Sequence, residues 1–299
     1  MLAIKSKTGS MNVARIAALV FLFIISAAYA YASQSTITEA EGYACMGEDR
    51  SRRQTELAAL EAAKRNAIEF ASTYMTSETH IKDFELEKDL VSAYANATVK
   101  VIKEIEKGWY KDARSGDCFS VKIKAEVIPD EKAMDKVSKR KDVADDPSAP
   151  LHVQVWTDKK EYERGDRMRI YIKGNKPFYA SVIYRDAAGK MVQILPNPYR
   201  NENYFQGGVI YEIPSGKDRF DLEISPPFGE ENISVYASTS PLGKIDLNSQ
   251  GGVYFVKTKA NDIGARTRGV SLTGKSTGKT GYASEFYENK AEIKTKSAR

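Results

Sequence analysis

The stretch VQVWTDKKEYERGDRMRIYIKGNKPFYASVIYRDAAGKMVQILPN, residues Val153–Asn197, decides the fold of the C-terminal part of the chain. Apolar and polar residues alternate from Met168 to Lys173, which is the period-two pattern of a strand with one buried face. A second apolar run, Phe178–Tyr184, ends at the turn sequence Asp186–Gly189, whose glycine can adopt a positive φ angle. These strand patterns and turns predict the start of an antiparallel β-domain.

Short strand patterns continue beyond this stretch. They are Val209–Ile213, Phe220–Ile224, Ile233–Ala237 and Val253–Val256. Seven or eight short strands separated by glycine and proline turns are typical of an immunoglobulin-like β-sandwich, with a small barrel as the alternative. We place this all-β domain at residues 151–257.

A different order of elements precedes the β-domain in residues 33–129. Strand patterns occupy Thr36–Met46, Thr98–Tyr110 and Asp117–Ile128, and helical patterns occupy Asp49–Thr76 and Leu86–Ala97. In the long helix, apolar residues that include Leu57 recur at spacings of three and four, and the inner face is rich in alanine, so the helix can lie close to a sheet. The chain is therefore expected to be an α+β protein, with a small N-terminal domain that lays a long helix on an antiparallel sheet.

Two segments of low apolar content flank the β-domain. Residues 130–150 are strongly charged and contain two prolines near their end, which predicts a linker with a helical turn or two at Glu131–Ser138. Residues 258–299 are basic and rich in Lys, Thr, Gly and Ser, which predicts a partly flexible tail. Within that tail, Thr267–Val270 and Ala291–Thr295 are candidates for edge strands.

The N-terminus has the pattern of a secretory signal peptide. Lys5, Lys7 and Arg15 precede the apolar run Ile16–Ile25, and small residues follow it. We expect residues 1–32 to be a signal peptide that is cleaved after Ala30 or Ala32, in a periplasmic or secreted protein. The alternative is an uncleaved segment, the only part of the chain that would then touch the membrane.

The chain has two cysteines, Cys45 and Cys118. In an oxidising compartment an even number of cysteines favours a disulfide, although two separate thiols remain the alternative. The bridge would close a loop of 118 − 45 = 73 residues, which the chain-entropy model values at about 4 kcal/mol.

Net charge argues against a nucleic-acid partner. Of the formal charge of +5, residues 1–30 carry +3 and residues 257–299 carry +6, so the intervening body carries 5 − 3 − 6 = −4. A slightly acidic body with a basic tail lacks the electrostatic pattern of a nucleic-acid-binding domain.

Short motifs in the chain resemble reactive or ligand-binding sites but lack their context. Residues Gly269–Ser276 match the phosphate-binding GxxxxGK[ST] pattern without the strand and helix that such a loop needs. Arg164-Gly165-Asp166 is expected to be a turn between strands rather than a recognition motif. We therefore predict no cofactor.

Titratable residues do not form a recognisable catalytic set. The two histidines, His80 and His152, lie far apart in sequence, and a pairing of His152 with Cys118 would require a free thiol. The acidic pairs Asp145-Asp146 and Glu230-Glu231 are expected to be solvated. We predict no catalytic residue and no metal site.

The connection Pro196–Gly208 is longer than a tight hairpin needs. It carries Tyr199, Arg200, Tyr204 and Phe205. Aromatic and arginine side chains on a loop held by a rigid sandwich suit the recognition of a protein or a glycan. The alternative is that Tyr204 and Phe205 fold back and cap the open end of the sandwich.

Motifs in the two regions resemble known bacterial domains. V-W-T-D-K (Val155–Lys159), Y-x-x-G-D (Tyr162–Asp166), I-L-P-N (Ile194–Asn197), E-I-P (Glu212–Pro214) and P-P-F-G-E-E (Pro226–Glu231) occur in the order of the bacterial domain-of-unknown-function family four-three-eight-four. That resemblance implies an accessory role, because the family is found attached to other modules.

The N-terminal region resembles a second, secreted domain. E-G-Y-A (Glu41–Ala44), the alanine-rich helix and the strand Phe119–Val127 are similar to the LPP-twenty lipoproteins and the N-terminal domain of flagellar assembly protein T. The signal peptide, the two small folds and the lack of a catalytic constellation predict a non-enzymatic, exported cell-envelope protein that acts as a protein–protein or glycan interaction module. The N-terminal resemblance alone implies a narrower role in assembling an envelope apparatus. The alternative is an envelope hydrolase with an unrecognised site.

Overall fold

The structure, a computed structural model, describes residues 33–78, 84–138, 144–268 and 283–298. Within these residues an 11-stranded sheet runs in the order β12-β13-β8-β7-β11-β14-β1-β3-β2, and β5 and β9 pair with β14 and β7 beside this path. A 3-stranded sheet has the order β10-β6-β4. These strand pairs are antiparallel, except for the pair β14–β5, which is parallel.

The strands of the large sheet are β1 (Ser33–Cys45), β2 (Thr98–Asp112), β3 (Gly116–Ile128), β5 (Glu161–Glu163), β7 (Phe178–Arg185), β8 (Met191–Leu195), β9 (Tyr204–Phe205), β11 (Glu230–Ser238), β12 (Leu247–Gln250), β13 (Val253–Val256) and β14 (Ala283–Lys296). The small sheet contains β4 (Val153–Thr157), β6 (Ile170–Gly174) and β10 (Tyr211–Ile213). The described helices are α2 (Arg52–Glu78), α3 (Phe84–Ala95), α4 (Glu131–Ser138) and α5 (Ala260–Arg268).

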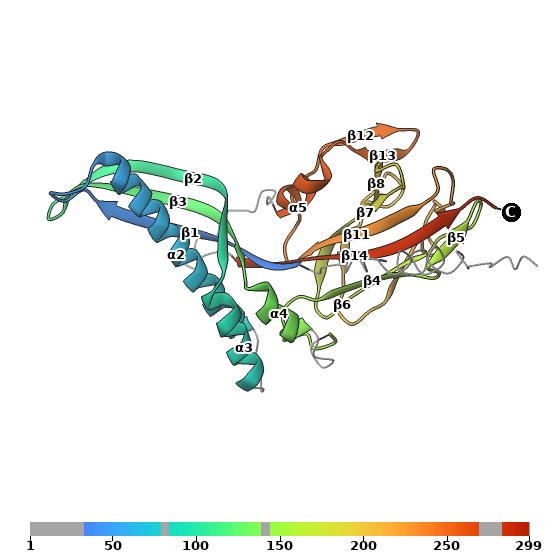
Figure 1. The fold of residues 1–299 in the computed structure, drawn as a ribbon, viewed down its shortest axis with the longest axis horizontal. Helices are drawn as coiled ribbons and strands as arrows, with labels where there is room; N and C mark the ends of the chain where they lie inside the picture. Colours follow the sequence, from blue (N-terminus) through green and yellow to red (C-terminus); the bar gives the residue numbers. More distant parts are fainter. Residues whose placement is uncertain (1–32, 79–83, 139–143, 269–282, 299) are drawn as a thin grey trace, which may run out of the picture. The chain divides into compact units, whose positions relative to one another are not determined.

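The predicted α+β class is confirmed, with a long helix on an antiparallel sheet and a mostly β C-terminal part (Figure 1). The helix α2 begins at a capping box, in which the Gln54 nitrogen donates to Ser51 Oγ and the Ser51 nitrogen donates to Gln54 Oε1. Its alanines at four-residue spacing are fully buried against the sheet; they are Ala59, Ala63, Ala67 and Ala71. Leu57, which the spacing assigned to this face, is exposed instead.

The helix α2 lies in close contact with β1 because both surfaces are small. A Cβ atom at Gly42 would lie 2.1 Å from the Ala63 nitrogen and 2.3 Å from the Ala59 oxygen. Only glycine fits at this position, and alanine on the helix completes the contact. The sequence requirement is therefore one glycine on the strand and an alanine stripe on the helix.

The two faces of the large sheet are covered by different elements. One face packs against α2 and α3 along β1 and β3, and against the small sheet along β7, β11 and β14. The other face packs against α5, where Ile263 meets Ile37 of β1, Ile183 of β7 and Phe286 of β14. In Figure 1, α5 and the β12–β13 hairpin accordingly lie on the opposite side of β11 and β14 from β4 and β6.

The position of β14 differs from the prediction that the basic tail adds edge strands. The strand lies inside the sheet, paired with β11 on one side and with β1 on the other. The other segment proposed as an edge strand begins with Thr267 and Arg268, which end the helix α5, and its remaining residues lie outside the described ranges. The large sheet of the C-terminal β-region therefore continues into the N-terminal strands, because β14 pairs with β1.

The charged segment 130–150 is packed more closely than a solvated linker would be. The predicted helical turns at Glu131–Ser138 are present as α4. Met134 and Val137 of this helix share a small hydrophobic cluster with Leu90 of α3 and with Ala149. The composition of the segment is that of a linker, yet Met134, Val137 and Ala149 are buried in this cluster.

The predicted signal peptide at residues 1–32 lies outside the described residues. Among the described helices, none is both long enough and apolar enough to cross a membrane.

We predict that Gly42→Ala lowers the free energy of unfolding by about 3 kcal/mol, because the added methyl group overlaps the backbone of α2. The matched control is Gly108→Ala in β2, where a Cβ atom meets no atom within 4 Å, so that its effect stays within about 0.5 kcal/mol. Denaturant unfolding of both variants with the disulfide intact measures this difference. Equal stabilities of the two variants would contradict the close contact.

Candidate functional site

The cysteines form a disulfide, as predicted, between β1 and β3. Cys45 and Cys118 are directly opposite in the strand register, and the Met46 nitrogen donates to the Asp117 oxygen beside them. The described residues contain no free cysteine. The Cys118–His152 pairing that a cysteine hydrolase would need is therefore not present.

His152 has a structural environment. Its Nδ1 lies 2.9 Å from the Tyr287 hydroxyl, and the two rings pack at a tilt. Burial lowers the pKa of His152 below its usual value, so the imidazole stays neutral at neutral pH. Because the folded pKa is the lower one, this group favours the folded state above its unfolded pKa and opposes it as the pH falls.

In each acidic pair one member, Asp145 or Glu230, is exposed as expected, and the other is engaged in hydrogen bonds. Asp146 Oδ1 accepts hydrogen bonds from the backbone nitrogen and Oγ of Ser148, and these bonds lower the pKa of Asp146. Glu231 is buried and accepts hydrogen bonds from the hydroxyl groups of Tyr184 and Thr295. In both places the carboxylate organises neighbouring backbone or strands.

The Arg164-Gly165-Asp166 motif is a turn, as expected. Gly165 has a φ angle of +83°, and its nitrogen donates to the Ile224 oxygen. Asp166 Oδ2 accepts hydrogen bonds from the Glu163 nitrogen and from Lys159 Nζ, which lowers the pKa of Asp166. Its carboxylate is thus engaged inside the turn.

No cluster of metal-ligating side chains occurs among the residues that the structure describes. The phosphate-loop pattern Gly269–Ser276 lies outside the described ranges. His80, the other histidine of the chain, also lies outside them.

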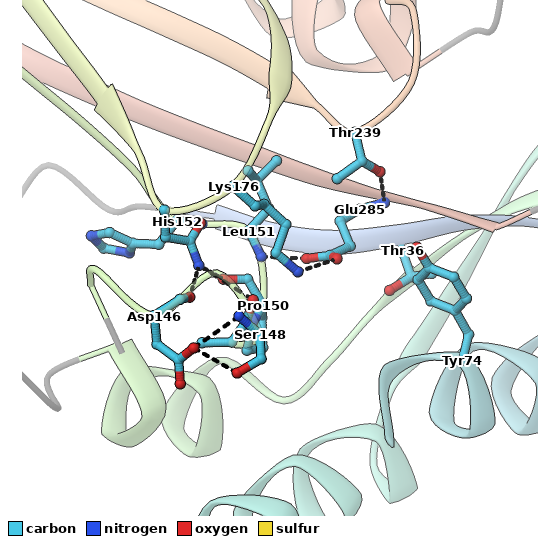
Figure 2. A network of polar contacts seen from close by, with 12 residues as sticks. Thr36, Tyr74, Asp146, Ser148, Pro150, Leu151, His152, Lys176, Thr239 and Glu285 are labelled. Atoms are coloured by element: carbon cyan, nitrogen blue, oxygen red, sulfur yellow. Dashed lines mark hydrogen bonds and ion pairs between the residues drawn. The ribbon is translucent and has the colours of Figure 1, made fainter. Parts of the chain in front are cut away.

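A buried polar network surrounds Glu285 on β14 (Figure 2). Its carboxylate accepts a 2.8 Å hydrogen bond from Lys176 Nζ and a further hydrogen bond from the Leu151 nitrogen, and its backbone nitrogen donates to Thr239 Oγ1. Its side chain is 2% exposed. A buried carboxylate of this kind is tolerated because hydrogen bonds and an opposite charge replace its water.

Asn175 extends this network to the end of the linker. Its Nδ2 donates to the carbonyl oxygens of Asp146, Ala149 and Pro150, and its Oδ1 accepts from the His152 nitrogen. Each of these polar groups is engaged with protein, so the network holds the linker against β14 and presents no reactive group. Sequence reasoning missed it because its members are single polar residues far apart in the chain.

The predicted recognition loop is held at its start by Asn197. Its Oδ1 accepts hydrogen bonds from the nitrogens of Tyr199 and Arg200, and its Nδ2 donates to the Ile194 oxygen. Asn197 is buried, so this turn is fixed from inside. The backbone of the loop is therefore ordered before any partner binds.

Two of the four predicted loop residues turn inward, which corrects their assignment as contact residues. Phe205 is 1% exposed and packs on Phe178 and Tyr211 in the β-core. Arg200 forms an ion pair with the Asp218 carboxylate at 3.0 Å, and its side chain is mostly buried. Of the two residues for which the alternative was that they fold back onto the sandwich, Phe205 does so.

The other two residues project outward. Tyr199 is 53% exposed and Tyr204 is 48% exposed. Tyr204 packs at a tilt on Tyr179, its partner in the β7–β9 pairing, and the Tyr199 hydroxyl approaches Gly252 in the β12–β13 turn. The loop therefore offers two exposed tyrosines on a backbone that three buried neighbours fix.

The fold is a β-rich module extended by an α+β layer. Residues 161–241 match the family model described as Domain of unknown function (DUF4384), which confirms the resemblance predicted for the C-terminal region. The matched segment spans β5 to β11 and leaves the central strand β14 outside. A search of the curated proteins found no match.

The family match does not reach residues 33–129. The resemblance of that region to the LPP-twenty lipoproteins and to flagellar assembly protein T therefore stays a prediction.

We predict that a thiol-reactive reporter detects two thiols per chain only after reduction, because Cys45 and Cys118 are bonded to each other. Replacing both by serine should lower the free energy of unfolding by about 4 kcal/mol, as expected for a loop of this length. Two thiols detected without a reductant would contradict the disulfide and restore the cysteine-hydrolase alternative.

We also predict that substitutions of the adjacent residues Phe205 and Tyr204 by alanine lower the free energy of unfolding by very different amounts. Phe205→Ala should lower the free energy of unfolding by about 4 kcal/mol, because it empties a core position. Tyr204→Ala should change it by about 0.5 kcal/mol or less, because that ring is exposed. Thermal and denaturant unfolding measure both, and similar losses for the two variants would contradict the burial of Phe205 and the exposure of Tyr204.

Proposed function

We propose that this chain is an exported, non-enzymatic protein of the cell envelope that recognises a protein partner through a surface containing Tyr199 and Tyr204. The observation that carries the proposal is the contrast within the loop. Asn197, Arg200 and Phe205 are fixed by hydrogen bonds, an ion pair and core packing, and the two tyrosines between them are exposed.

A pre-ordered loop of this kind suits binding on physical grounds. Tyrosine buries a large amphipathic side chain with few rotatable bonds, and it is enriched among residues that dominate interface energies. A backbone that is already fixed loses little further entropy when the partner binds. The tyrosines have no packing role comparable with that of Phe205, which leaves them available for contact.

Two features support export. The basic, apolar and small-residue regions of residues 1–32 follow the order of a signal peptide, and Cys45–Cys118 is a bond typical of oxidising compartments. A narrower role in assembling an envelope apparatus is supported by the N-terminal resemblance alone. The hydrolase alternative is less well supported, because the cysteines are bonded to each other and because Asp146 and Glu231 are engaged in hydrogen bonds that hold local structure.

The experiment that tests the proposal is site-specific photo-crosslinking in cells that export the full chain. A photoreactive phenylalanine analogue replaces Tyr199 or Tyr204, and the control carries it at Tyr43, an exposed tyrosine of the N-terminal sheet. We expect a discrete protein adduct from positions 199 and 204 but not from 43. Adding Tyr204→Ser should reduce the adduct at position 199 by about tenfold, as expected for a hot-spot residue.

The outcome that overturns the proposal is the absence of a discrete adduct at both loop positions, or equal labelling at all three positions. Fractionation of the same cells tests export separately, since a cytoplasmic location of the chain would contradict the envelope part of the proposal.

A further inference from the structure

The outer face of the small sheet carries an aromatic pair far from the loop in sequence. Trp156 of β4 and Tyr171 of β6 are directly opposite in register, with ring centroids 5.6 Å apart and an interplanar angle of 18°. Their neighbours Val155, Ile170 and Ile172 pack in or on the β-core. Because side chains alternate along a strand, the two rings lie on the opposite face, toward solvent.

Neither ring is explained by the packing of the fold. Trp156 and Tyr171 are only half-buried and belong to no hydrophobic cluster of the described residues. Within the described ranges, no hydrogen bond engages the indole nitrogen of Trp156. The stacked tryptophan–tyrosine pair is thus a partly accessible aromatic area that lies outside the hydrophobic clusters of the described residues.

The polar groups around the pair are balanced in charge. Arg169, which directly precedes β6, forms an ion pair with Glu212 of β10, and Glu212 lies opposite Tyr171 in register. Lys173 of β6 pairs with the Asp145 carboxylate, and Gln154 lies opposite Lys173 on β4. Each cation has a carboxylate partner, so this face holds hydrogen-bond donors and acceptors without a surplus of charge.

We propose that this face binds a neutral oligosaccharide of pyranose sugars. A pyranose ring has an apolar C–H face and a rim of hydroxyl groups. The accessible parts of the half-buried Trp156 and Tyr171 rings match the C–H face, and the Gln154 amide with the two ion pairs supplies donors and acceptors for the hydroxyls.

Two observations favour this ligand over other classes. The balanced charge leaves no free cation for a phosphate or sulfate, which argues against a polyanion. The surface is a strand-supported face, and two cavities of the described residues lie elsewhere: one is lined by Ile183 and Tyr236, and the other by Lys100 and Arg266. A chain of sugars, which can lie along a flat surface, fits better than a small enclosed metabolite. The inference does not depend on the loop tyrosines.

The test uses the purified full chain with its disulfide intact and three soluble probes: cellohexaose, chitohexaose and maltohexaose. The variant Trp109→Phe leaves Trp156 as the single tryptophan, so its fluorescence reports on this face. We expect a saturable change in emission with at least one probe. Trp156→Ala and Tyr171→Ala should each weaken the affinity, measured by calorimetry on the chain that retains Trp109, by about tenfold or more.

Matched controls separate this site from the rest of the molecule. Tyr43→Ala removes an exposed tyrosine elsewhere, and Tyr199→Ser with Tyr204→Ser removes the loop surface; both should bind the probe as the unaltered chain does. Heparin should not compete, because the face has no free cation. Circular dichroism checks that each variant is folded.

The proposal is overturned if none of the three probes binds below about 10 mM, or if Trp156→Ala and Tyr171→Ala bind as tightly as the unaltered chain. Loss of the photo-crosslinked adduct in Trp156→Ala, without any sugar binding, would instead assign the face to the protein partner. Failure of the crosslinking experiment alone leaves the sugar site standing, so the two proposals fail separately.

Discussion

The architecture depends on the pairing of β14 with strands from both halves of the chain. Residues Ala283–Glu288 pair with Ser33–Thr38 of β1, and the remainder of β14 extends along β11. Without this strand, β1-β3-β2 and β8-β7-β11 would be two sheets with open edges. Buried ionic contacts hold it on both faces: Glu285 with Lys176 on one, and Arg268 with Glu126 and Glu288 on the other. A shift of one residue would move Glu285 to the other face, away from Lys176.

Local patterns in the sequence predicted most elements well. The alternation Asp117–Ile128, the alanine stripe of α2 and the short helix Glu131–Ser138 all appear where they were expected, because each depends on residues near in sequence. The position of β14 could not be predicted in the same way. Its first half, Ala283–Tyr287, is buried on both faces and therefore shows no clean alternation, and its partners are distant in the chain. Only the second half gave a strand signal.

The loop shows the same limit at the scale of single residues. Tyr204 and Phe205 are adjacent aromatic residues, and the sequence does not indicate which of the two side chains is exposed. They form a two-residue strand on β7, and the register of that strand sends Phe205 into the core and Tyr204 outward. The sequence pattern does not predict the register in which these two residues pair with β7. The Trp156–Tyr171 pair is similar, since both lie at outward positions of readable strands but become one surface only when β4 and β6 pair.

The central position of β14 also governs the order in which the chain can complete its fold. The pair Ser33–Glu288 is separated by 288 − 33 = 255 residues, so it closes only after nearly all of the described chain is present. Contacts of such long range form slowly, and strand edges that await their partners are prone to pair with other chains. A nascent chain therefore carries open edges on β1 and β11 until its last described strand inserts. Any chaperone that shields extended strands would act in that interval.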